Sequence, residues 1–277
     1  MANGSELYAS ARIAAREREF LSEEDFARLD CAACDRLLAE RGRAELFGFF
    51  SEICTKPDFL QVMRAKEDAF NAKCALKFRA TGNPAFRALA SAQGTVTAQT
   101  VFECVSAGAF RDLPDFLRSA LSEDSAPSGA REIDTAMDFA FFKERARLSR
   151  KLPAAVRTAF ALEVDLLNLE ILFRCRALGE SASPYLLEGG EESAEIWRAR
   201  VALPSEDWAK AVAGRRVSDC ARKAFCSDSP VSALSGMRKN LFCERFGGIR
   251  EGFLAQVGYW FRREAECARI RRVRCGF

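Results

Sequence analysis

The chain has 277 residues, of which 49% are hydrophobic and 29% are charged, and its formal net charge is +3. With half of its residues apolar, it is able to bury a sizeable core as one large domain or as two to three smaller ones. No apolar run approaches the ~20 residues of a membrane span, and the first residues lack the basic start and apolar stretch of a signal peptide, so we expect a cytoplasmic protein.

Two helices are predicted at the start of the chain. Residues 6–20 combine strong helix formers with apolar residues on successive turns. Ser22 then suits the N-cap of a second helix, because acidic residues fill the first turn that follows it. Comparable starts, in which a hydroxyl side chain is followed one turn later by a large apolar residue, occur at Thr97 and Ser205.

The chain contains eleven cysteines, which are scattered through helical patterns. Because no export signal is recognised, we expect reduced thiols rather than disulfides. Cys31 and Cys34 have the CxxC spacing of a zinc or redox site, but no second CxxC follows them. The sequence favours the interpretation that they are small apolar residues on a helix, with metal or redox chemistry as the lesser alternative.

Long helices are predicted in the middle of the chain. Residues 132–142 begin one that has apolar residues on one face. Residues 161–179 are apolar on nearly every side of a helix and still include Asp165 and Asn168, so this helix is expected to lie buried, with Gly179 placed to end it. Because β-branched residues are few and alternating patterns are short, we expect an all-α fold.

An internal repeat with a spacing of 97 residues relates three segments of the chain. The segments 68–82 and 165–179 match at five of fifteen positions, and 262–276 matches at fewer. Three units of this size, each ending in a long helix that closes on glycine, account for the whole chain. The predicted units are 1–82, 83–179 and 180–277.

The repeat pairs Asp68 and Asn71 with Asp165 and Asn168. In each pair the Asp and the Asn are three residues apart, which places both side chains on one face of the helix. One interpretation of such a pair is a metal site or acid–base chemistry. An unsatisfied buried polar group costs ~1–3 kcal/mol, so hydrogen bonds to backbone or hydroxyl groups are the expected arrangement. The sequence favours a structural role for these pairs.

The last long helix is expected from about Ile249 to Cys275. The predicted inward stripe is Leu254, Val257, Phe261, Ala265 and Ala268, with Phe253, Trp260 and Cys267 beside it. The segment from Arg238 to Phe277 has ten Lys or Arg residues and four acidic ones, a local charge of +6. Because its aromatic residues are expected to face inward, an acidic protein partner is favoured over nucleic acid. The candidate interface residues are Arg262, Arg263, Arg269 and Arg272.

The sequence offers no established catalytic constellation. Histidine is absent, which removes Ser-His-Asp and Cys-His systems and imidazole metal ligands. We recognise no GxxxxGK[ST] loop, no GxGxxG motif after a strand and no nucleophile elbow. Carboxylate or lysine chemistry stays possible, but nothing concentrates it, so we expect no catalytic residue, no cofactor and no metal.

Five segments, in order along the chain, resemble the C subunit of the archaeal and bacterial A/V-type rotary ATPases, the relative of the d subunit in eukaryotic V-ATPases. They are similar to its opening Tyr-x-x-Ala-Arg helix, its second-helix start, its Glu-x-x-x-Asp-x-x-Tyr-Phe segment, its Asp-x-x-Asn-Leu-Lys-x-x-x-Arg helix and its Tyr-x-x-x-Lys-Glu-x-Glu-x-x-x-Leu-Arg ending. In this chain they are Tyr8–Ile13, Phe20–Phe26, Glu132–Phe142, Asp165–Arg174 and Tyr259–Arg271.

This resemblance implies three similar helical bundles arranged with pseudo-threefold symmetry as a funnel. It also implies a non-catalytic rotor part: a socket that receives the central shaft (the D and F subunits), rests on the membrane ring of proteolipid c (K) subunits, and transmits torque for ion transport coupled to ATP hydrolysis or synthesis. Such a protein would be cytoplasmic and peripheral to the membrane. An unrelated all-helical adaptor that binds an acidic protein partner is the alternative.

Overall fold

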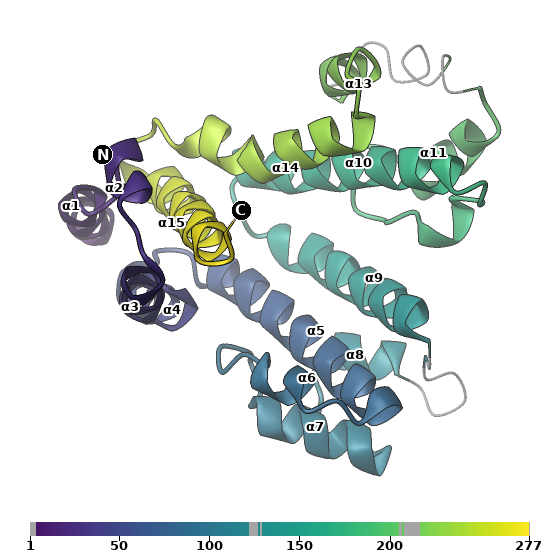
Figure 1. The fold of residues 1–277 in the computed structure, drawn as a ribbon, viewed down its shortest axis with the longest axis horizontal. Coiled ribbons are helices and arrows are strands. Elements are labelled where there is room, and N and C mark those ends of the chain that lie inside the picture. Colours follow the sequence, from purple (N-terminus) through teal and green to yellow (C-terminus); the bar gives the residue numbers. More distant parts are fainter. Residues whose placement is uncertain (1–3, 122–126, 128, 205–206, 208–216, 277) are drawn as a thin grey trace. The chain divides into compact units, whose positions relative to one another are not determined.

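The computed structural model describes all residues except 1–3, 122–126, 128, 205–206, 208–216 and 277. It consists of helices joined by short connections, and its described residues include no β-strand (Figure 1). The predicted all-α fold is therefore confirmed. Across the described residues, every helix is either too short or too polar to cross a membrane.

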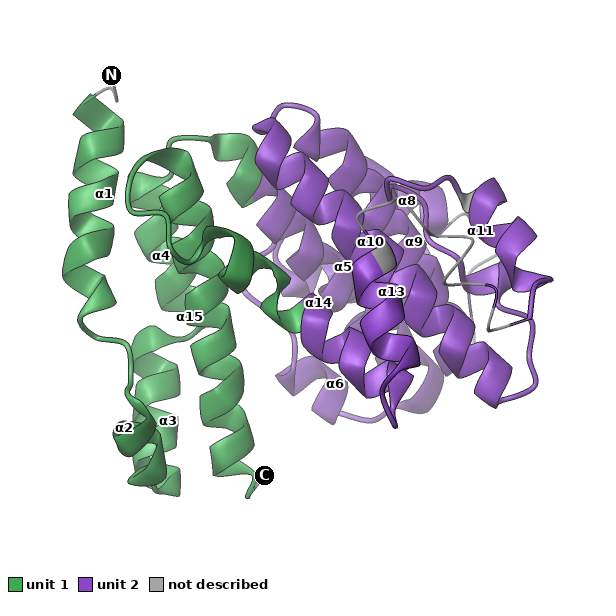
Figure 2. Ribbon diagram, turned by 90° about the horizontal axis from the view of Figure 1, so that it is seen from above, with its two compact units in different colours: residues 1–60, 239–277 green, residues 61–238 purple. Residues whose placement is uncertain are grey.

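The chain divides into two compact units, which Figure 2 shows in different colours. Unit 1 joins residues 1–60 to residues 239–277, and unit 2 holds residues 61–238. The boundary between the units falls inside two long helices, α5 and α14. The division into 1–82, 83–179 and 180–277 stays a prediction.

Unit 1 brings the two ends of the chain together. Its helices are α1 (Gly4–Glu17), α2 (Glu23–Ala27), α3 (Cys31–Arg41), α4 (Arg43–Ile53), the start of α5 (Pro57–Thr81), the end of α14 (Pro230–Phe246) and α15 (Gly252–Arg274). Helix α15 packs against α1, α3 and α4. Its buried Trp260 receives the rings of Phe47, Phe50 and Phe59 edge-on, at centroid distances of 5.0, 4.8 and 5.8 Å.

Val257 of the predicted stripe and the flanking Phe253, Trp260 and Cys267 are buried as predicted, but the rest of the buried face of α15 differs from the prediction. Ala265 and Ala268 are exposed, and Phe261 is half-buried against Phe242. The buried residues of α15 are Phe253, Ala255, Gln256, Val257, Gly258, Tyr259, Trp260, Arg263, Glu266, Cys267 and Ile270. Gln256, Arg263 and Glu266 are polar, so a pattern based on hydrophobicity alone placed Ala265 and Ala268 on the buried side in their stead. The physical reason is that polar groups occupy core positions here because they find partners inside unit 1.

The predicted N-caps at Ser22 and Thr97 are confirmed. The Ser22 hydroxyl accepts a hydrogen bond from the Asp25 amide at 3.2 Å, and the Asp25 carboxylate accepts one from the Ser22 amide at 2.8 Å. The Thr97 hydroxyl accepts one from the Thr100 amide at 3.1 Å. Ser205 lies outside the described residues, and Ser193 is instead the N-cap of a helix that the sequence did not indicate.

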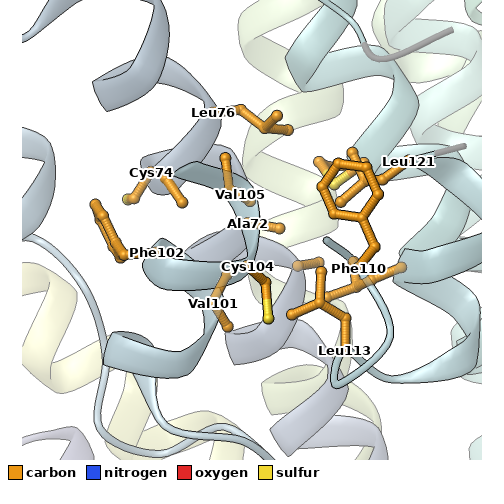
Figure 3. Packing of buried hydrophobic residues seen from close by; sticks show 14 of the residues in the cluster. Ala72, Cys74, Leu76, Val101, Phe102, Cys104, Val105, Phe110, Leu113 and Leu121 are labelled. Atoms are coloured by element: carbon orange, nitrogen blue, oxygen red, sulfur yellow. The ribbon is translucent and has the colours of Figure 1, made fainter. Parts of the chain in front are cut away.

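Unit 2 is built around α5, α7, α8, α9 and α10. Its helices are the rest of α5, α6 (Ala85–Ala88), α7 (Ala98–Ala107), α8 (Asp115–Ala120), α9 (Ala130–Ser149), α10 (Ala154–Ala177), α11 (Ala194–Val201), α13 (Ser218–Phe225), the start of α14, and a 3₁₀ turn at Ser183–Tyr185. One core cluster includes Leu76 of α5, Val105 of α7 and Leu121 at the end of α8, which Figure 3 shows together. Met137 of α9 belongs to the same cluster.

The helix predicted at 161–179 forms the greater part of α10, which ends at Ala177. The backbone of Gly179 has a φ of +70°, a left-handed conformation that favours glycine and ends a helix. Gly82 and Gly276, which lie 97 residues to either side, have φ values of +68° and +77°. Three equally spaced helices, α5, α10 and α15, therefore end in the same way.

Candidate functional site

The two Asn side chains of the repeat bind loops of their own unit in the same way. Asn71 donates to the Ser91 carbonyl at 2.9 Å and accepts from the Ser91 amide at 2.7 Å. Asn168 donates to the Leu187 carbonyl at 2.9 Å and accepts from the Leu187 amide at 2.8 Å. Each Asn is fully buried, and its amide group pairs with both backbone groups of one residue. Each therefore clamps the loop that follows its helix.

The two Asp side chains bind the same loops, a few residues after the positions that the Asn side chains bind. Asp68 accepts hydrogen bonds from the Thr95 amide at 2.8 Å and from the Val96 amide at 3.4 Å. Asp165 accepts from the amides of Glu191 and Glu192 at 3.0 and 3.5 Å. In both cases these are the two residues that precede an N-cap. The two pairs thus occupy equivalent positions, and backbone amides, the Thr95 hydroxyl and the Trp197 indole satisfy the aspartates, which supports the structural interpretation.

Glycine is required where each loop passes its aspartate. A Cβ atom added to Gly94 would lie 2.2 Å from Oδ1 of Asp68, and one added to Gly190 would lie 2.1 Å from Oδ1 of Asp165. Real Cβ atoms do not approach an oxygen so closely. The loops therefore reach their aspartates because these positions have no side chain.

A third contact of this kind occurs in unit 1. Glu266 of α15 accepts a hydrogen bond from the Leu21 amide at 2.8 Å, and Leu21 directly precedes the N-cap Ser22. Glu266 is buried and also pairs with Arg263. Each of the three helices that close on glycine therefore carries a buried carboxylate that binds the chain just before a capped helix.

Burial changes the proton affinity of the two aspartates. It raises the pKa of Asp165 to about 7, against the opposing effect of hydrogen bonds from the Glu191 amide, the Trp197 indole and the Glu192 amide. Burial likewise raises the pKa of Asp68, opposed mainly by the Thr95 hydroxyl. The low polarity of the interior disfavours each charged form, while the donors around it favour that form.

Three of the four candidate interface arginines form ion pairs within unit 1. Arg262 pairs with Glu17, and Arg269 pairs with Glu23 and lies over the Phe26 ring at 3.9 Å. Arg263 is 1% exposed and is held by Glu266. Glu17 of α1 and Glu23 in the first turn of α2 are partners that the sequence alone did not connect to the basic segment, whereas Glu266 lies within it.

Arg272 differs from the other three. It is exposed, and among the described residues no hydrogen bond or ion pair engages its side chain. Of the four candidates, it is therefore the one whose charge is available to a partner.

A groove of about 680 Å³ lies between α9 and α10 of unit 2. Its apolar wall on α10 is formed by Leu167, Ile171 and Leu178, which follow one another at helical spacing, and Leu178 is 67% exposed. Phe139 and Phe142 of α9 also line it. The sequence missed this groove because α10 is apolar nearly all round, which predicts burial on every side.

Charged side chains of both signs also line the groove, and each is already held in place. Asp134 and Asp138 accept from Lys77 and Lys73 at 2.8 and 2.7 Å. Arg131 pairs with Glu180 and lies over the Tyr185 ring at 4.4 Å. Arg174 and Arg238 both pair with the buried Glu170. The groove thus combines an apolar stripe with positioned charges, as protein-binding grooves do.

These features define an all-helical protein whose buried polar groups bind its own loops and which presents a groove lined by apolar and charged residues. Residues 35–274 match the family model of the ATP synthase (C/AC39) subunit, so the chain belongs to the C/d-subunit family of the V/A-type ATPases. A comparison with curated proteins found no match.

Proposed function

We propose that this chain is a non-catalytic central-rotor subunit that links the shaft of a rotary V/A-type ATPase to its membrane proteolipid ring. The observation that carries the proposal is the family match, which spans residues 35–274. In this role the protein transmits torque between ATP hydrolysis or synthesis and ion movement. It would work at the cytoplasmic face of the membrane, with shaft subunits of the D and F type and ring subunits of the c (K) type as partners.

The buried polar pairs support a mechanical role. A part that transmits torque must resist deformation, and its loops are the segments that deform most easily. Asn71 and Asn168 tie two of these loops to α5 and α10 through paired backbone hydrogen bonds. A buried, fully bonded polar group specifies one loop position, because any other leaves it unsatisfied.

We place one partner contact in the groove between α9 and α10. Its stripe of Leu167, Ile171 and Leu178 would fit the apolar face of a partner helix, and its internally paired arginines and aspartates form the polar part of its lining. The alternative, an adaptor whose basic last helix binds an acidic partner, draws less support, because Arg262, Arg263 and Arg269 form ion pairs within unit 1.

Co-expression with shaft and ring subunits tests the proposal. A tagged copy of this chain is expected to recover both sets of partners, and a folded chain that recovers neither contradicts the rotor role. Leu178→Glu then tests the groove and is expected to weaken recovery of at least one partner. Leu89→Glu is the matched control, because Leu89 is 59% exposed in unit 2 and does not line the groove. Equal recovery with both variants would remove the groove from the proposal.

A further inference from the structure

Two thiols lie in the first turn of α3. Cys31 is the first residue of the helix and is exposed, whereas Cys34 is completely buried one turn later. The N-cap Asp30 accepts a hydrogen bond from the Ala33 amide at 2.7 Å, so the helix begins at this point in a defined way. One thiol is therefore open to a reagent in solution, and the second is shielded from it.

The spacing allows the two sulfurs to be joined. Residues three apart on a helix face the same side, with Cβ atoms ~5–6 Å apart. A disulfide needs Cβ atoms ~3.5–4.5 Å apart, so the turn must tighten slightly. The first turn is where a helix adjusts most easily, because its leading amides have no intrahelical partner. Inside a helix the same pair would have to distort backbone hydrogen bonds.

The end of α15 lies beside Cys31. Its Sγ lies 3.9 Å from the Arg274 carbonyl oxygen at the end of α15. The Arg274 guanidinium is paired with Asp35, and its pKa is raised first by that carboxylate and then by the nearby thiols Cys275 and Cys31. The thiolate is the form that attacks a disulfide, and the exposed Cys31 is the thiol of this pair that a dissolved disulfide can reach.

A metal site does not explain the pair. Among the described residues, no three cysteines, aspartates or glutamates come close enough together to hold a metal ion. The further exposed thiol, Cys275, is therefore not a third ligand. Oxidation is the other chemistry that the CxxC spacing allows.

We propose that Cys31 and Cys34 form a reversible disulfide, with a small disulfide such as glutathione disulfide as the oxidant. The Cys31 thiolate attacks one sulfur of glutathione disulfide, a mixed disulfide forms, and one glutathione thiolate leaves. Cys34 loses its proton to solvent and attacks Sγ of Cys31, which breaks the mixed disulfide and releases the second glutathione. Two protein thiols are oxidised and one glutathione disulfide is reduced to two thiols.

Oxidation has a structural consequence within unit 1. In the reduced protein, Cys34 belongs to a buried cluster with Phe26, Leu37 and Ile270, which joins α3 to α15. Burial also raises the pKa of the Cys34 thiol. Drawing its sulfur toward Cys31 removes it from the cluster. The redox state of the pair therefore controls how tightly the end of α15 is packed.

Peptide mapping of the whole protein tests this inference without any substitution. Trypsin cleaves after Arg28 and Arg36, so residues 29–36 form one peptide that holds both cysteines and no others. After incubation with glutathione disulfide and alkylation of the remaining thiols, this peptide is expected to lack two hydrogens and to carry neither glutathione nor the alkylating group. Cys226, an exposed cysteine of unit 2, is the internal control and is expected to keep its glutathione.

Two variants assign the roles of the thiols. In Cys34→Ala, the same peptide is expected to retain glutathione on Cys31, because no second thiol resolves the mixed disulfide. In Cys31→Ser, Cys34 is expected to be alkylated only after unfolding. Glutathione persisting on Cys31 of the wild-type protein, alkylation of both thiols, or a link from peptide 29–36 to residues 275–277 would each overturn the proposal.

Discussion

Single buried polar side chains decide where the loops of unit 2 lie. Asn168 contributes two hydrogen bonds to one residue of a loop that has no regular structure of its own. Asp165 fixes the same loop further along, at the entry of α11. The free energy of such contacts comes less from the bonds themselves than from the cost of leaving their partners unsatisfied in the interior.

The first prediction concerns Asn168. Asn168→Ala leaves the amide and the carbonyl of Leu187 without partners, so we expect it to lower the free energy of unfolding by ~2–4 kcal/mol. Asn71→Ala is expected to have a similar effect through Ser91. Gln99→Ala, at an exposed residue of α7, is the control and is expected to change stability by less than ~0.5 kcal/mol. Urea unfolding measures the stability of all three variants. An effect of Asn168→Ala as small as that of the control would show that the hydrogen bonds from Asn168 to Leu187 do not stabilise the protein.

The second prediction concerns the pH dependence from Asp165. The folded protein holds a proton on this carboxyl up to a pKa of about 7, whereas the unfolded chain loses it near the ordinary pKa of 3.8. The stabilisation is thus fully present below the unfolded pKa and is lost as the pH rises through the folded pKa, with a slope of at most ~1.4 kcal/mol per pH unit.

Asp165→Asn provides the comparison, because asparagine does not titrate. The wild-type free energy of unfolding minus that of the variant is expected to fall as the pH rises toward 7 and to level off above it. Unfolding curves at a series of pH values give this difference directly. A difference that grows with pH would show that the hydrogen bonds to the carboxylate outweigh its burial.

At the scale of the element, α5 and α10 are followed by similar features along the chain. Each leads to a left-handed glycine, then to a loop that is hydrogen-bonded to the helix, and then to a short capped helix. The loop approaches the helix closely enough only where glycine faces the aspartate, at Gly94 and Gly190. These glycines lie outside the fifteen compared positions of the repeat, so only the packing shows that they correspond.

The third prediction tests this close approach. Gly190→Ala places a Cβ atom 2.1 Å from Oδ1 of Asp165, and the loop must move. We expect a loss of ~1–3 kcal/mol in the free energy of unfolding. Gly236→Ala is the matched control, since nothing lies within 4 Å of its added Cβ, and in a helix alanine is preferred to glycine by ~0.5–1 kcal/mol. Two variants with equal effects would contradict the tight packing.

The fourth prediction follows from the observed orientation of α15. Trp260→Ala removes a ring that is 1% exposed and is expected to cost ~3–5 kcal/mol. Phe261→Ala, at the next residue, removes a half-buried ring and is expected to cost less. Thermal or denaturant unfolding ranks the two variants. The reverse order would restore the orientation that the hydrophobic pattern predicts, with Phe261 facing inward.

At the scale of the whole molecule, three buried carboxylates repeat one contact. Asp68 and Asp165 bind the chain just before the N-caps of α7 and α11, and Glu266 does so before the N-cap of α2. In the third case the helix comes last in the sequence and the capped helix comes first. The contact in unit 1 therefore joins the two ends of the chain, which a linear comparison of repeats does not reveal.

The fifth prediction distinguishes Arg262, whose charge stabilises the fold, from Arg272, whose charge is expected to contact a partner. Arg272→Glu is expected to leave stability within ~0.5 kcal/mol and to weaken association with shaft or ring subunits at low salt, by an amount that shrinks as salt is added. Arg262→Glu places a carboxylate beside Glu17 and is expected to cost ~1–3 kcal/mol in stability. Unfolding and salt-dependent binding measurements distinguish them, and unchanged binding of Arg272→Glu at low salt would contradict a partner contact.

The sequence by itself determined the all-α fold, the caps at Ser22 and Thr97, the helix end at Gly179 and the repeated Asp/Asn pairs. These depend on local features, because capping, helix periodicity and left-handed glycine involve residues within a turn or two of one another. The family resemblance was also within reach, since its motifs are short and occur in order along the chain.

Only the tertiary structure decided which face of α15 is buried, which arginines are free, and where the groove lies. Arg262 and Arg269 pair with Glu17 and Glu23, which lie more than two hundred residues earlier in the sequence. Ion pairs depend on distance in space, and hydrophobic periodicity carries no information about a partner so far away. A hydrophobic pattern also cannot distinguish a helix buried on every side from α10, where one apolar stripe is left open to the groove.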